Sequence, residues 1–344
     1  MIREGIEAVV AGRHLTEAEA MAVMTEIMEG NATPAQIAAF IVGLRLKGET
    51  VEEITGCARV MREKATFIRT PVGSQPVDTA GTGGDGAHTF NISTTAAFVA
   101  AGAGVVMAKH GNRAASSQCG SADLLEALGI NIALEPTGVE AAIREVGIGF
   151  LFAPALHGAM RHAVGPRREI GVRTIFNILG PLTNPARAQH QLVGIYNGAL
   201  TAMMATVLHN LGGKRAFVVH GSDGLDELTT TGATTVSELR GGQVKTYTVQ
   251  PQDFGLPTTP LEALRGGDAQ CNAALTLRLL QGEKLPQRSI VLLNAAAAIA
   301  AGTEERSIAE CLPLAQQALD SGAGLTKLEK LREFTQQWSR TSED

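Results

Sequence analysis

The chain has 344 residues, of which 44% are hydrophobic and only 4% aromatic, and its formal net charge is −5 at pH 7. This length favours about two domains with aliphatic cores. The acidic balance disfavours a nucleic-acid-binding protein, which needs a basic face. No signal peptide is visible, and no uninterrupted apolar run has the ~18 residues of a membrane span. We therefore expect a cytoplasmic protein that binds neither nucleic acid nor membrane.

The four cysteines are scattered without CxxC spacing, at Cys57, Cys119, Cys271 and Cys311. Neither a zinc site nor a disulfide framework is expected.

Residues 1–65 are predicted to be entirely helical. Capping boxes, in which a threonine is followed three residues later by Glu or Gln, mark helix starts at Thr16, Thr33 and Thr50. Apolar residues with helical spacing follow these starts. We expect a small helical bundle, and then a linker at 66–75, where proline, glycine and serine break the pattern.

A glycine-rich loop at residues 81–86 (Gly-Thr-Gly-Gly-Asp-Gly) follows a short predicted strand at 76–79. Glycines permit positive φ, so several backbone N–H groups can point at one anion. The next segment, 91–95, opens a predicted helix at 96–103, and the first N–H groups of a helix have no partners within it. The pattern indicates a phosphate site, and a tight turn is the plainer alternative. GxxxxGK[ST] and GxGxxG spacing are both absent, which disfavours a kinase or a dehydrogenase.

A second loop at residues 109–113 (Lys-His-Gly-Asn-Arg) follows a predicted strand at 104–108 and adds full positive charge. The carboxyl ends of neighbouring parallel strands share one crevice, so we expect the two loops to face one ligand. Lys109 and Arg113 are predicted to bind phosphate there rather than to be surface charges. The chain then enters a predicted helix at 122–128.

From residue 76 onward, predicted strands and helices alternate, which favours an α/β fold with a mostly parallel sheet flanked by helices. The polar helical segment 154–185 interrupts this alternation. A capping box of Thr137 and Glu140 predicts another helix start. Further strands are expected at 131–134, 149–152, 191–196, 215–220 and 289–293, with a hairpin region at 229–242.

Asp226 and Glu227 form an acidic pair in a glycine-bearing turn after a predicted strand. Adjacent carboxylates suit Mg²⁺, which shares its oxygen ligands between protein and phosphate groups. A solvated turn is the plainer interpretation. GxSxG is absent, so a covalent acyl mechanism is disfavoured.

Six motifs follow one another along the chain in the order that a known family has them: GTGGD (81–85), NIST (91–94), KHGNRA (109–114), GSADLLEALG (120–129), VRTIFNILGPLTNP (172–185) and HGSDGLDELT (220–229). Together they resemble the anthranilate phosphoribosyltransferases. The resemblance implies transfer of phosphoribosyl from 5-phosphoribosyl-1-diphosphate (PRPP) to the amine of anthranilate, with release of pyrophosphate, in tryptophan biosynthesis. It also implies a fold like that of the nucleoside phosphorylases and phosphoribosyltransferases.

The same resemblance implies a domain organisation. A smaller all-helical domain comprises 1–65, completed by part of 154–185, and an α/β PRPP-binding domain comprises 76–153 and 186–344. A homodimer would form through the helical domain.

Site roles also follow from the resemblance. Lys109, Asp226 and Glu227 would be catalytic, and Ser93, Asp226 and Glu227 would hold two Mg²⁺ ions. PRPP would meet Gly81, Thr82, Gly83, Gly84, Asp85, Thr89, Asn91, Ser93, Thr94, Lys109 and Ser121. Anthranilate would meet Gly81, His110, Asn112, His157, Arg167 and Pro181.

Arginine is the usual partner of a carboxylate, because its planar guanidinium makes two parallel hydrogen bonds. Arg167 is the better match for the anthranilate carboxylate. Its neighbour Arg168 stays a candidate, because the preceding Gly165-Pro166 departs from the family pattern.

Two alternatives remain from the sequence. A pyrimidine-nucleoside phosphorylase also cuts at C1 of a sugar, but it has no need of the acidic pair. A non-catalytic, nucleic-acid-binding relative should be basic and should have lost part of these motifs, whereas this chain is acidic and keeps them.

Overall fold

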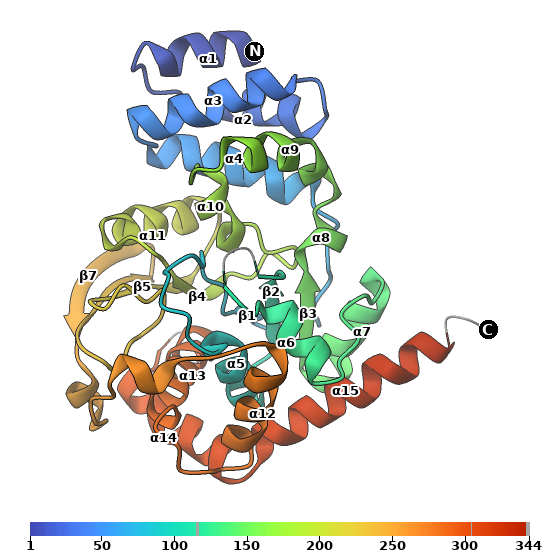
Figure 1. The fold of residues 1–344 in the computed structure, drawn as a ribbon, viewed down its shortest axis with the longest axis vertical. Coiled ribbons are helices and arrows are strands. Elements are labelled where there is room, and N and C mark those ends of the chain that lie inside the picture. The colour runs from blue at the N-terminus through green and yellow to red at the C-terminus, as the bar shows by residue number, and fades with distance from the viewer. Residues whose placement is uncertain (115–116, 304, 342–344) are drawn as a thin grey trace.

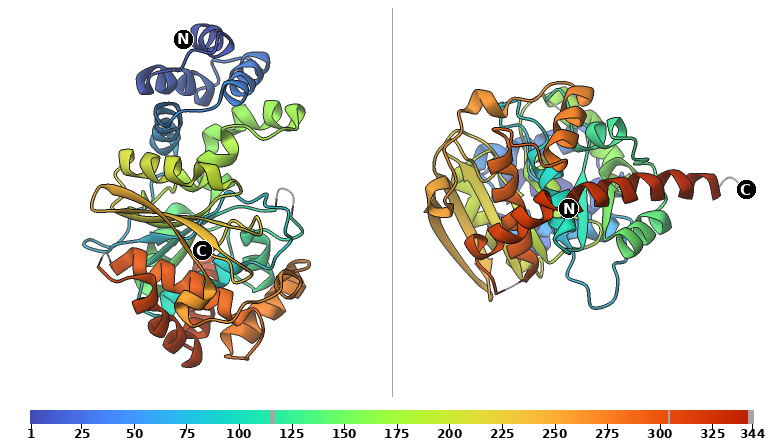
Figure 2. Two further views of the ribbon diagram at one scale, coloured as in Figure 1. Left: turned by 90° about the vertical axis from the view of Figure 1, so that its left-hand side faces the viewer. Right: turned by 90° about the horizontal axis from the view of Figure 1, so that it is seen from below.

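A layer of helices stands above a sheet whose far face is covered by a second group of helices (Figures 1 and 2). The computed structural model describes residues 1–114, 117–303 and 305–341. The expected α/β fold with a mostly parallel sheet and a smaller helical part is confirmed. No helix among these residues is both long enough and apolar enough to cross a membrane.

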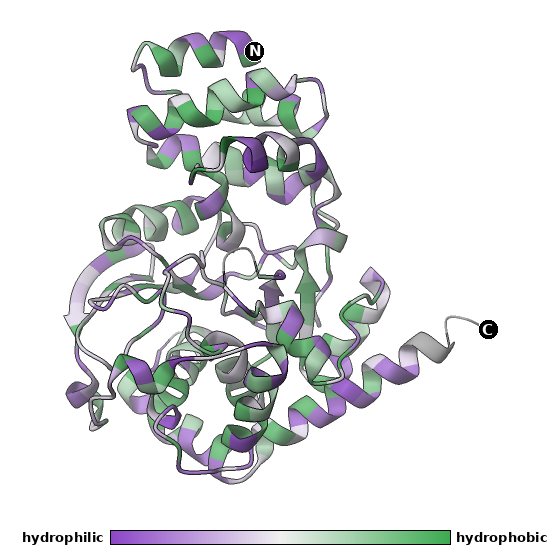
Figure 3. Cartoon of the chain, in the orientation of Figure 1, coloured by the Kyte–Doolittle hydropathy of each residue, from purple (hydrophilic) through white to green (hydrophobic). Residues whose placement is uncertain are grey.

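The N-terminal layer contains α1 (Ile2–Val10), α2 (Glu17–Met28), α3 (Pro34–Lys47) and α4 (Val51–Lys64). The capping boxes predicted at Thr16, Thr33 and Thr50 are all formed, each with a reciprocal side-chain and backbone pairing. These helices mix hydrophobic and hydrophilic residues (Figure 3), and they bury most of the hydrophobic ones, such as Phe40 and Leu44, which have no exposed surface.

A second segment returns to this layer after the third strand. It contains α8 (Ala153–Leu156), η1 (Gly158–Met160), α9 (Arg161–Ile170), α10 (Phe176–Leu179) and η2 (Gly180–Leu182). Helix α9 packs on α2 and α3, and α10 contacts α4. Residues distant in sequence therefore build one helical layer.

The sheet has seven strands in the order β3-β2-β1-β4-β5-β6-β7. The strands are β1 (Val77–Asp78), β2 (Met107–Gly111), β3 (Ile148–Phe152), β4 (His190–Gly194), β5 (Arg215–Gly221), β6 (Thr234–Arg240) and β7 (Gln243–Val249). The first five are parallel, and β6 and β7 add an antiparallel hairpin at one edge. Gly241 and Gly242 make its turn, both with positive φ, as a two-residue hairpin loop requires.

Helices cover both faces of the sheet. Those that contact its strands are α5 (Ile92–Gly102), α7 (Pro136–Val146), α11 (Thr201–Asn210), α13 (Arg288–Thr303) and α15 (Ala323–Thr341). Three more helices pack on this layer: α6 (Ser121–Ala127) on α12 (Ala269–Leu280), α12 on α5 and α15, and α14 (Ile308–Asp320) on α13 and α5. Short 3₁₀ turns complete the chain: η3 (Gly198–Leu200), η4 (Pro251–Phe254) and η5 (Leu261–Leu264).

Strand β5 shows how two cores are separated by the sheet, because successive side chains point to opposite faces. Phe217 and Val219 join the core of α5 and α13. Ala216 and Val218 join the core that α11 shares with the N-terminal helices. Small residues allow close packing in the first core: a Cβ at Gly102 of α5 would lie 2.6 Å from the Gly324 nitrogen.

Two predicted strands are wrong. Residues 289–293 belong to α13, because the apolar run continues into alanines that favour a helix. Residues 131–134 form no strand; Asn131 accepts from Ala133 N and its own N–H donates to Thr335 of α15.

The helix start predicted at Thr137 is also wrong. Helix α7 begins one residue earlier, with Pro136 at its first position. Glu140 does not cap it, because its carboxylate accepts the Arg69 N–H at 2.8 Å.

Candidate active site

The loops that follow β1, β4 and β5 meet at the carboxyl ends of these strands, on the side of the helical layer (Figure 1). Gly81 bridges to Gly194, and Thr82 N donates to the Gly194 carbonyl at 2.9 Å. Gly83 N donates to Asp226 Oδ2 at 2.7 Å. The glycine-rich loop and the acidic turn, far apart in sequence, are thus in direct contact.

Two glycines make this approach sterically feasible. A Cβ at residue 81 would lie 2.5 Å from Asp226 Oδ2, and one at residue 194 would lie 1.5 Å from the Asp226 carbonyl oxygen. Gly83 and Gly84 add φ values of 63° and 73°, which other residues rarely adopt.

Negative charge gathers at Asp85, Asp226 and Glu227. Burial, followed by the charge of Asp85, raises the pKa of Asp226 to about 7. Burial and then Asp226 raise the pKa of Glu227 well above its ordinary value. Such a cluster favours binding of a cation. Within the described ranges, no set of three or more His, Cys, Asp or Glu side chains could hold a metal by itself, so a metal here would need further oxygen ligands, such as phosphate.

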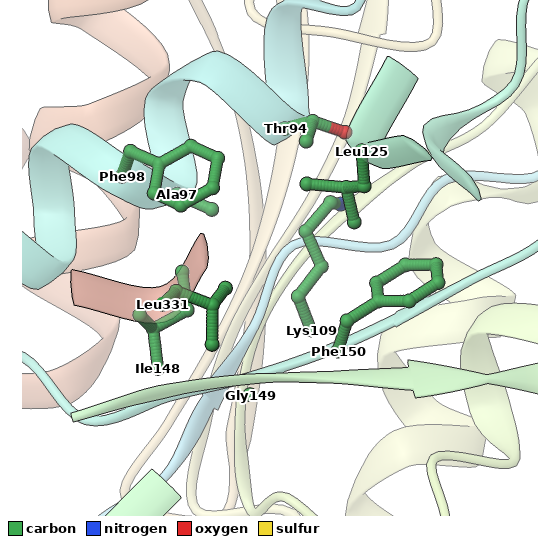
Figure 4. Close-up of a pocket in the computed structure, with 9 residues that line it drawn as sticks. All are labelled: Thr94, Ala97, Phe98, Lys109, Leu125, Ile148, Gly149, Phe150 and Leu331. Carbon is green, nitrogen blue, oxygen red and sulfur yellow. The ribbon is translucent and has the colours of Figure 1, made fainter. Parts of the chain in front are cut away.

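Lys109 is a buried strand residue, with 4% of its surface exposed. The strand was predicted to end before it, but β2 runs from Met107 to Gly111. Its Nζ donates to the Thr79 carbonyl at 2.8 Å and lies 3.5 Å from Ser93 Oγ. The side chain extends past Phe150 and Leu125 beside a small cavity (Figure 4). Burial lowers the pKa of Lys109, and Asp78 opposes this.

The start of α5 contributes to the same place. Ser93 N hydrogen-bonds to Glu227. The hydroxyl of Thr94 is buried and has no partner among the described residues. A buried hydroxyl without a partner has already lost its contact with water, so a hydrogen bond to a ligand requires little further desolvation.

Other residues predicted to bind PRPP make internal contacts. The Asn91 side chain donates to the Cys119 carbonyl at 3.1 Å and accepts from Asn272 at 2.9 Å. Thr82 Oγ1 accepts from Tyr196 N, Ser121 Oγ donates to the Asn112 carbonyl, and Thr89 forms a bridge with Arg265. These contacts fix the loops around the site.

The phosphate role predicted for Arg113 is not supported. The Arg113 side chain is 49% exposed, and its guanidinium pairs with Asp123 at 3.0 Å and with Glu126 at 2.5 Å. Helix α6 presents both carboxylates to the loop, so this positive charge is already compensated.

His110 and His157 form a second, uncharged part of the site. Their ring centroids are 5.1 Å apart. Burial lowers the pKa of His110 to about 3 and that of His157 to about 4. The rings hydrogen-bond to the carbonyls of Gly180 and Thr183, and both Nε2 atoms are buried without a partner in the described part of the chain. Two neutral imidazoles therefore offer acceptor atoms.

Arg167 and Arg168 differ in their surroundings. The half-buried Arg167 places its guanidinium 5.1 Å from the centre of the Phe176 ring, and burial lowers its pKa. Arg168 is exposed. Pro181 lies buried in η2 beside the two histidines' carbonyl partners, whereas Asn112 is exposed.

Two residues were missed by the sequence reasoning. Asp78 is buried, accepts from His110 N at 3.0 Å and from Asn184 Nδ2 at 2.8 Å, and burial raises its pKa to about 6. Arg173 donates to the Gly84 carbonyl and lies 4.2 Å from the centre of the Tyr196 ring. An acidic residue in an apolar strand was a signal for Asp78, and Arg173 lies in the motif at 172–185 but was given no role there.

Known families agree with this arrangement. Residues 73–325 match the glycosyl transferase family, a/b domain, and residues 3–65 match the helical bundle domain of the same family. The fold and the site are those of a glycosyl transferase of this family.

A relative named anthranilate phosphoribosyltransferase from Symbiobacterium thermophilum is 59% identical over 332 residues, covering 96% of each chain. Another, from Moorella thermoacetica, is 56% identical over 341 residues, covering 98% of this chain and all of its own. The chain belongs to the anthranilate phosphoribosyltransferases.

Solved structures agree. Anthranilate phosphoribosyltransferase from Thermus thermophilus has a TM-score of 0.92 and 46% identity, over 96% of this chain and 99% of that one. The Saccharomyces cerevisiae enzyme in complex with PRPP and Mg has a TM-score of 0.87 and 26% identity, over 98% of each chain. These likenesses favour this family over the nucleoside phosphorylases and nucleic-acid-binding relatives considered from the sequence.

Proposed function

We propose that this protein is an anthranilate phosphoribosyltransferase, which converts PRPP and anthranilate into N-(5-phosphoribosyl)anthranilate and pyrophosphate in tryptophan biosynthesis. One observation carries the proposal: the glycine-rich loop contacts the acidic turn through Gly83 and Asp226, with Lys109 and two neutral histidines nearby. A polyanion site and an acceptor site are thus adjacent.

The PRPP half would consist of the loop 81–85, the start of α5 and Lys109. The Thr94 hydroxyl is unpartnered among the described residues, and Lys109 supplies charge close to Ser93. These groups are fixed by their own packing, so they need little rearrangement to stabilise charge on a departing pyrophosphate. Asn91, Thr89, Thr82 and Ser121 would support this half.

Magnesium fits the acidic part of the site. Burial, followed by the charge of Asp85, raises the pKa of Asp226, so a cation here would favour its charged form, and carboxylate and hydroxyl oxygens are suitable ligands. Ser93, Asp226 and Glu227 would hold it, as two ions together with the phosphates of PRPP. When bound, Mg²⁺ neutralises charge on the leaving pyrophosphate.

The acceptor half would use His110, His157 and Arg167, with Gly81, Asn112 and Pro181 shaping the space. The amine of anthranilate is neutral near pH 7, so a strong base is not required. The Nε2 atoms of His110 and His157 are acceptors suited to an amine N–H. Arg167 would pair with the carboxylate. The C1–O bond to pyrophosphate breaks, the C1–N bond forms, and the amine then loses one proton.

Domain organisation and assembly are part of the proposal. The helical domain would comprise 1–65 and part of 154–185, with a linker at 66–75 and the α/β domain at 76–153 and 186–344. Val10 of α1 and Leu46 of α3 are 72% and 82% exposed, and removing apolar surface from water is favourable. We propose that this layer forms a homodimer and that the enzyme works in the cytoplasm.

The test is a fluorescence assay of anthranilate consumption. Anthranilate should be consumed only when PRPP and Mg²⁺ are both present, and EDTA should stop the reaction. Consumption without PRPP, or none with both reagents present, would reject the proposed function.

A further inference from the structure

The turn that carries Asp226 and Glu227 must be held against electrostatic repulsion. Asp85 and Asp226 interact directly, and Glu227 is close to both. Carboxylates gathered in this way repel one another before a cation arrives. A turn without support would be expected to splay, yet the structure holds it against Gly83 and Gly194.

Asn294 holds this turn through hydrogen bonds to the backbone of Leu228. It is completely buried in α13, where its buried neighbours from Ile290 to Ala301 are all apolar. Its Nδ2 donates to the Leu228 carbonyl at 2.9 Å, and its Oδ1 accepts from Leu228 N at 3.0 Å. Its second N–H donates to the Ile290 carbonyl at 2.9 Å. A buried amide is costly unless it is paired, and here its pairing fixes the residue next to Glu227.

Asp223 makes hydrogen bonds within the same turn. One of its carboxylate oxygens accepts from the hydroxyls of Thr229 at 2.6 Å and Thr231 at 2.5 Å. The other accepts from Leu225 N at 3.1 Å. Residues 223–231 are therefore bound together around the acidic pair, and no bond from Asp223 goes to Asp226 or Glu227 among the described residues.

We infer that Asn294 and Asp223 are positioning residues, which hold Asp226 and Glu227 in place for Mg²⁺ and PRPP before either ligand arrives. The inference rests on the proposed function of the acidic pair. A site whose ligands are already fixed does not have to be ordered when the ligand binds, so it binds more tightly.

Two variants test the inference, Asn294→Ala and Asp223→Asn. The second retains the size of the side chain and lies in a turn, so it remains informative if the first does not fold. Thr276→Val is the matched control, because it removes a buried hydroxyl pair, to Thr95 at 3.1 Å, that does not involve the turn.

Hydrogen–deuterium exchange of peptides covering 223–231, measured without ligands, reports on the support directly. Exchange should be about tenfold faster in both positioning variants, since losing a hydrogen bond lowers the local opening free energy, and unchanged in Thr276→Val. Unchanged exchange in both variants would overturn the inference, whatever the enzyme's activity.

Titration calorimetry of PRPP in the presence of Mg²⁺ supplies the second measurement. Binding should weaken about three- to thirtyfold in both variants, and the Mg²⁺ concentration for half-maximal turnover should rise with it. The Michaelis constant for anthranilate should stay within about twofold. Faster exchange with unchanged PRPP binding would show a purely structural role. Wild-type protein that binds PRPP without consuming anthranilate would instead reject the proposed function and leave the positioning role supported.

Discussion

Burial controls the charges around the crevice. It raises the pKa of Asp78, Asp226 and Glu227 and lowers that of Lys109 and both histidines. The carboxylates therefore favour a cation, and the histidines stay neutral hydrogen-bond acceptors throughout the physiological range. One half of the crevice is suited to phosphates and metal, and the other to an aromatic amine.

Arg167→Ala should raise the Michaelis constant for anthranilate and leave that for PRPP nearly unchanged. Charge-assisted pairing with a carboxylate contributes about 1.5–3 kcal/mol per bond, so kcat/KM should fall roughly ten- to several-hundredfold. Arg168→Ala is the control, because Arg168 is exposed. A selective anthranilate defect in Arg168→Ala would show that Arg168, not Arg167, binds the carboxylate. If neither variant has such a defect, another residue binds the carboxylate.

Asp78 should make stability depend on pH. Its pKa is about 6 in the folded protein and about 3.9 when unfolded, so the folded state binds the proton more tightly. Its contribution to stability is present below about pH 4 and is lost as the pH rises through about 6, by about 2–3 kcal/mol. Urea unfolding of wild type and Asp78→Asn should be measured from about pH 4 to 7.5. As the pH rises over this range, the free energy of unfolding of the wild type should fall relative to that of the variant.

Because other titrating groups are common to both proteins, only the difference between the two curves is diagnostic. A difference that is constant over this range would mean that Asp78 titrates normally.

The helices of the N-terminal layer were predicted closely because their signals are local. Each threonine of a capping box and its partner three residues later lie within one turn, so the sequence contains the whole interaction. The 289–293 strand failed because a short apolar run is compatible with either element. Thr137 and Glu140 failed because Glu140 is engaged by Arg69, 71 positions away, which only the fold reveals.

The same distinction holds for the site. The glycine loop and the acidic pair were visible as motifs, but their contact depends on Gly194, which no local pattern marked. The ion pair of Arg113 with Glu126 could not be predicted from its loop, because Glu126 comes from the following helix. Asn294 could not be recognised, since its importance lies in pairing with Leu228, 66 residues away.

Gly194→Ala should damage the contact between the loops. A Cβ there would lie 1.5 Å from the Asp226 carbonyl oxygen, so the acidic turn must shift. We expect PRPP binding to weaken by more than about tenfold, with stability reduced by about 1–3 kcal/mol. Gly165→Ala, in α9 with no atom near the added Cβ, should bind PRPP normally and be slightly more stable. Normal PRPP affinity in Gly194→Ala would show that the acidic turn is not required where the structure places it.

The whole molecule combines two layers through one hydrophobic core, because α11 and the upper face of the sheet pack with the N-terminal helices. Val10 and Leu46 of that layer are exposed. Light scattering at micromolar concentration should give about twice the monomer mass of 35.9 kDa, since covering these side chains stabilises a dimer. Val10→Glu with Leu46→Glu should shift the protein to monomer, whereas charge reversal at the exposed Arg144 should not. A wild-type monomer would refute the dimer.

The most direct test of the account as a whole is product analysis by mass spectrometry and pyrophosphate detection. Wild-type enzyme with PRPP, anthranilate and Mg²⁺ should form N-(5-phosphoribosyl)anthranilate and pyrophosphate in equal amounts. The Asp226→Ala, Glu227→Ala double variant should retain its fold, because turn carboxylates hold no core together, but lose most turnover and its wild-type Mg²⁺ response. Absence of the coupled products from wild type, or full activity with an unchanged Mg²⁺ response in the double variant, would contradict the account.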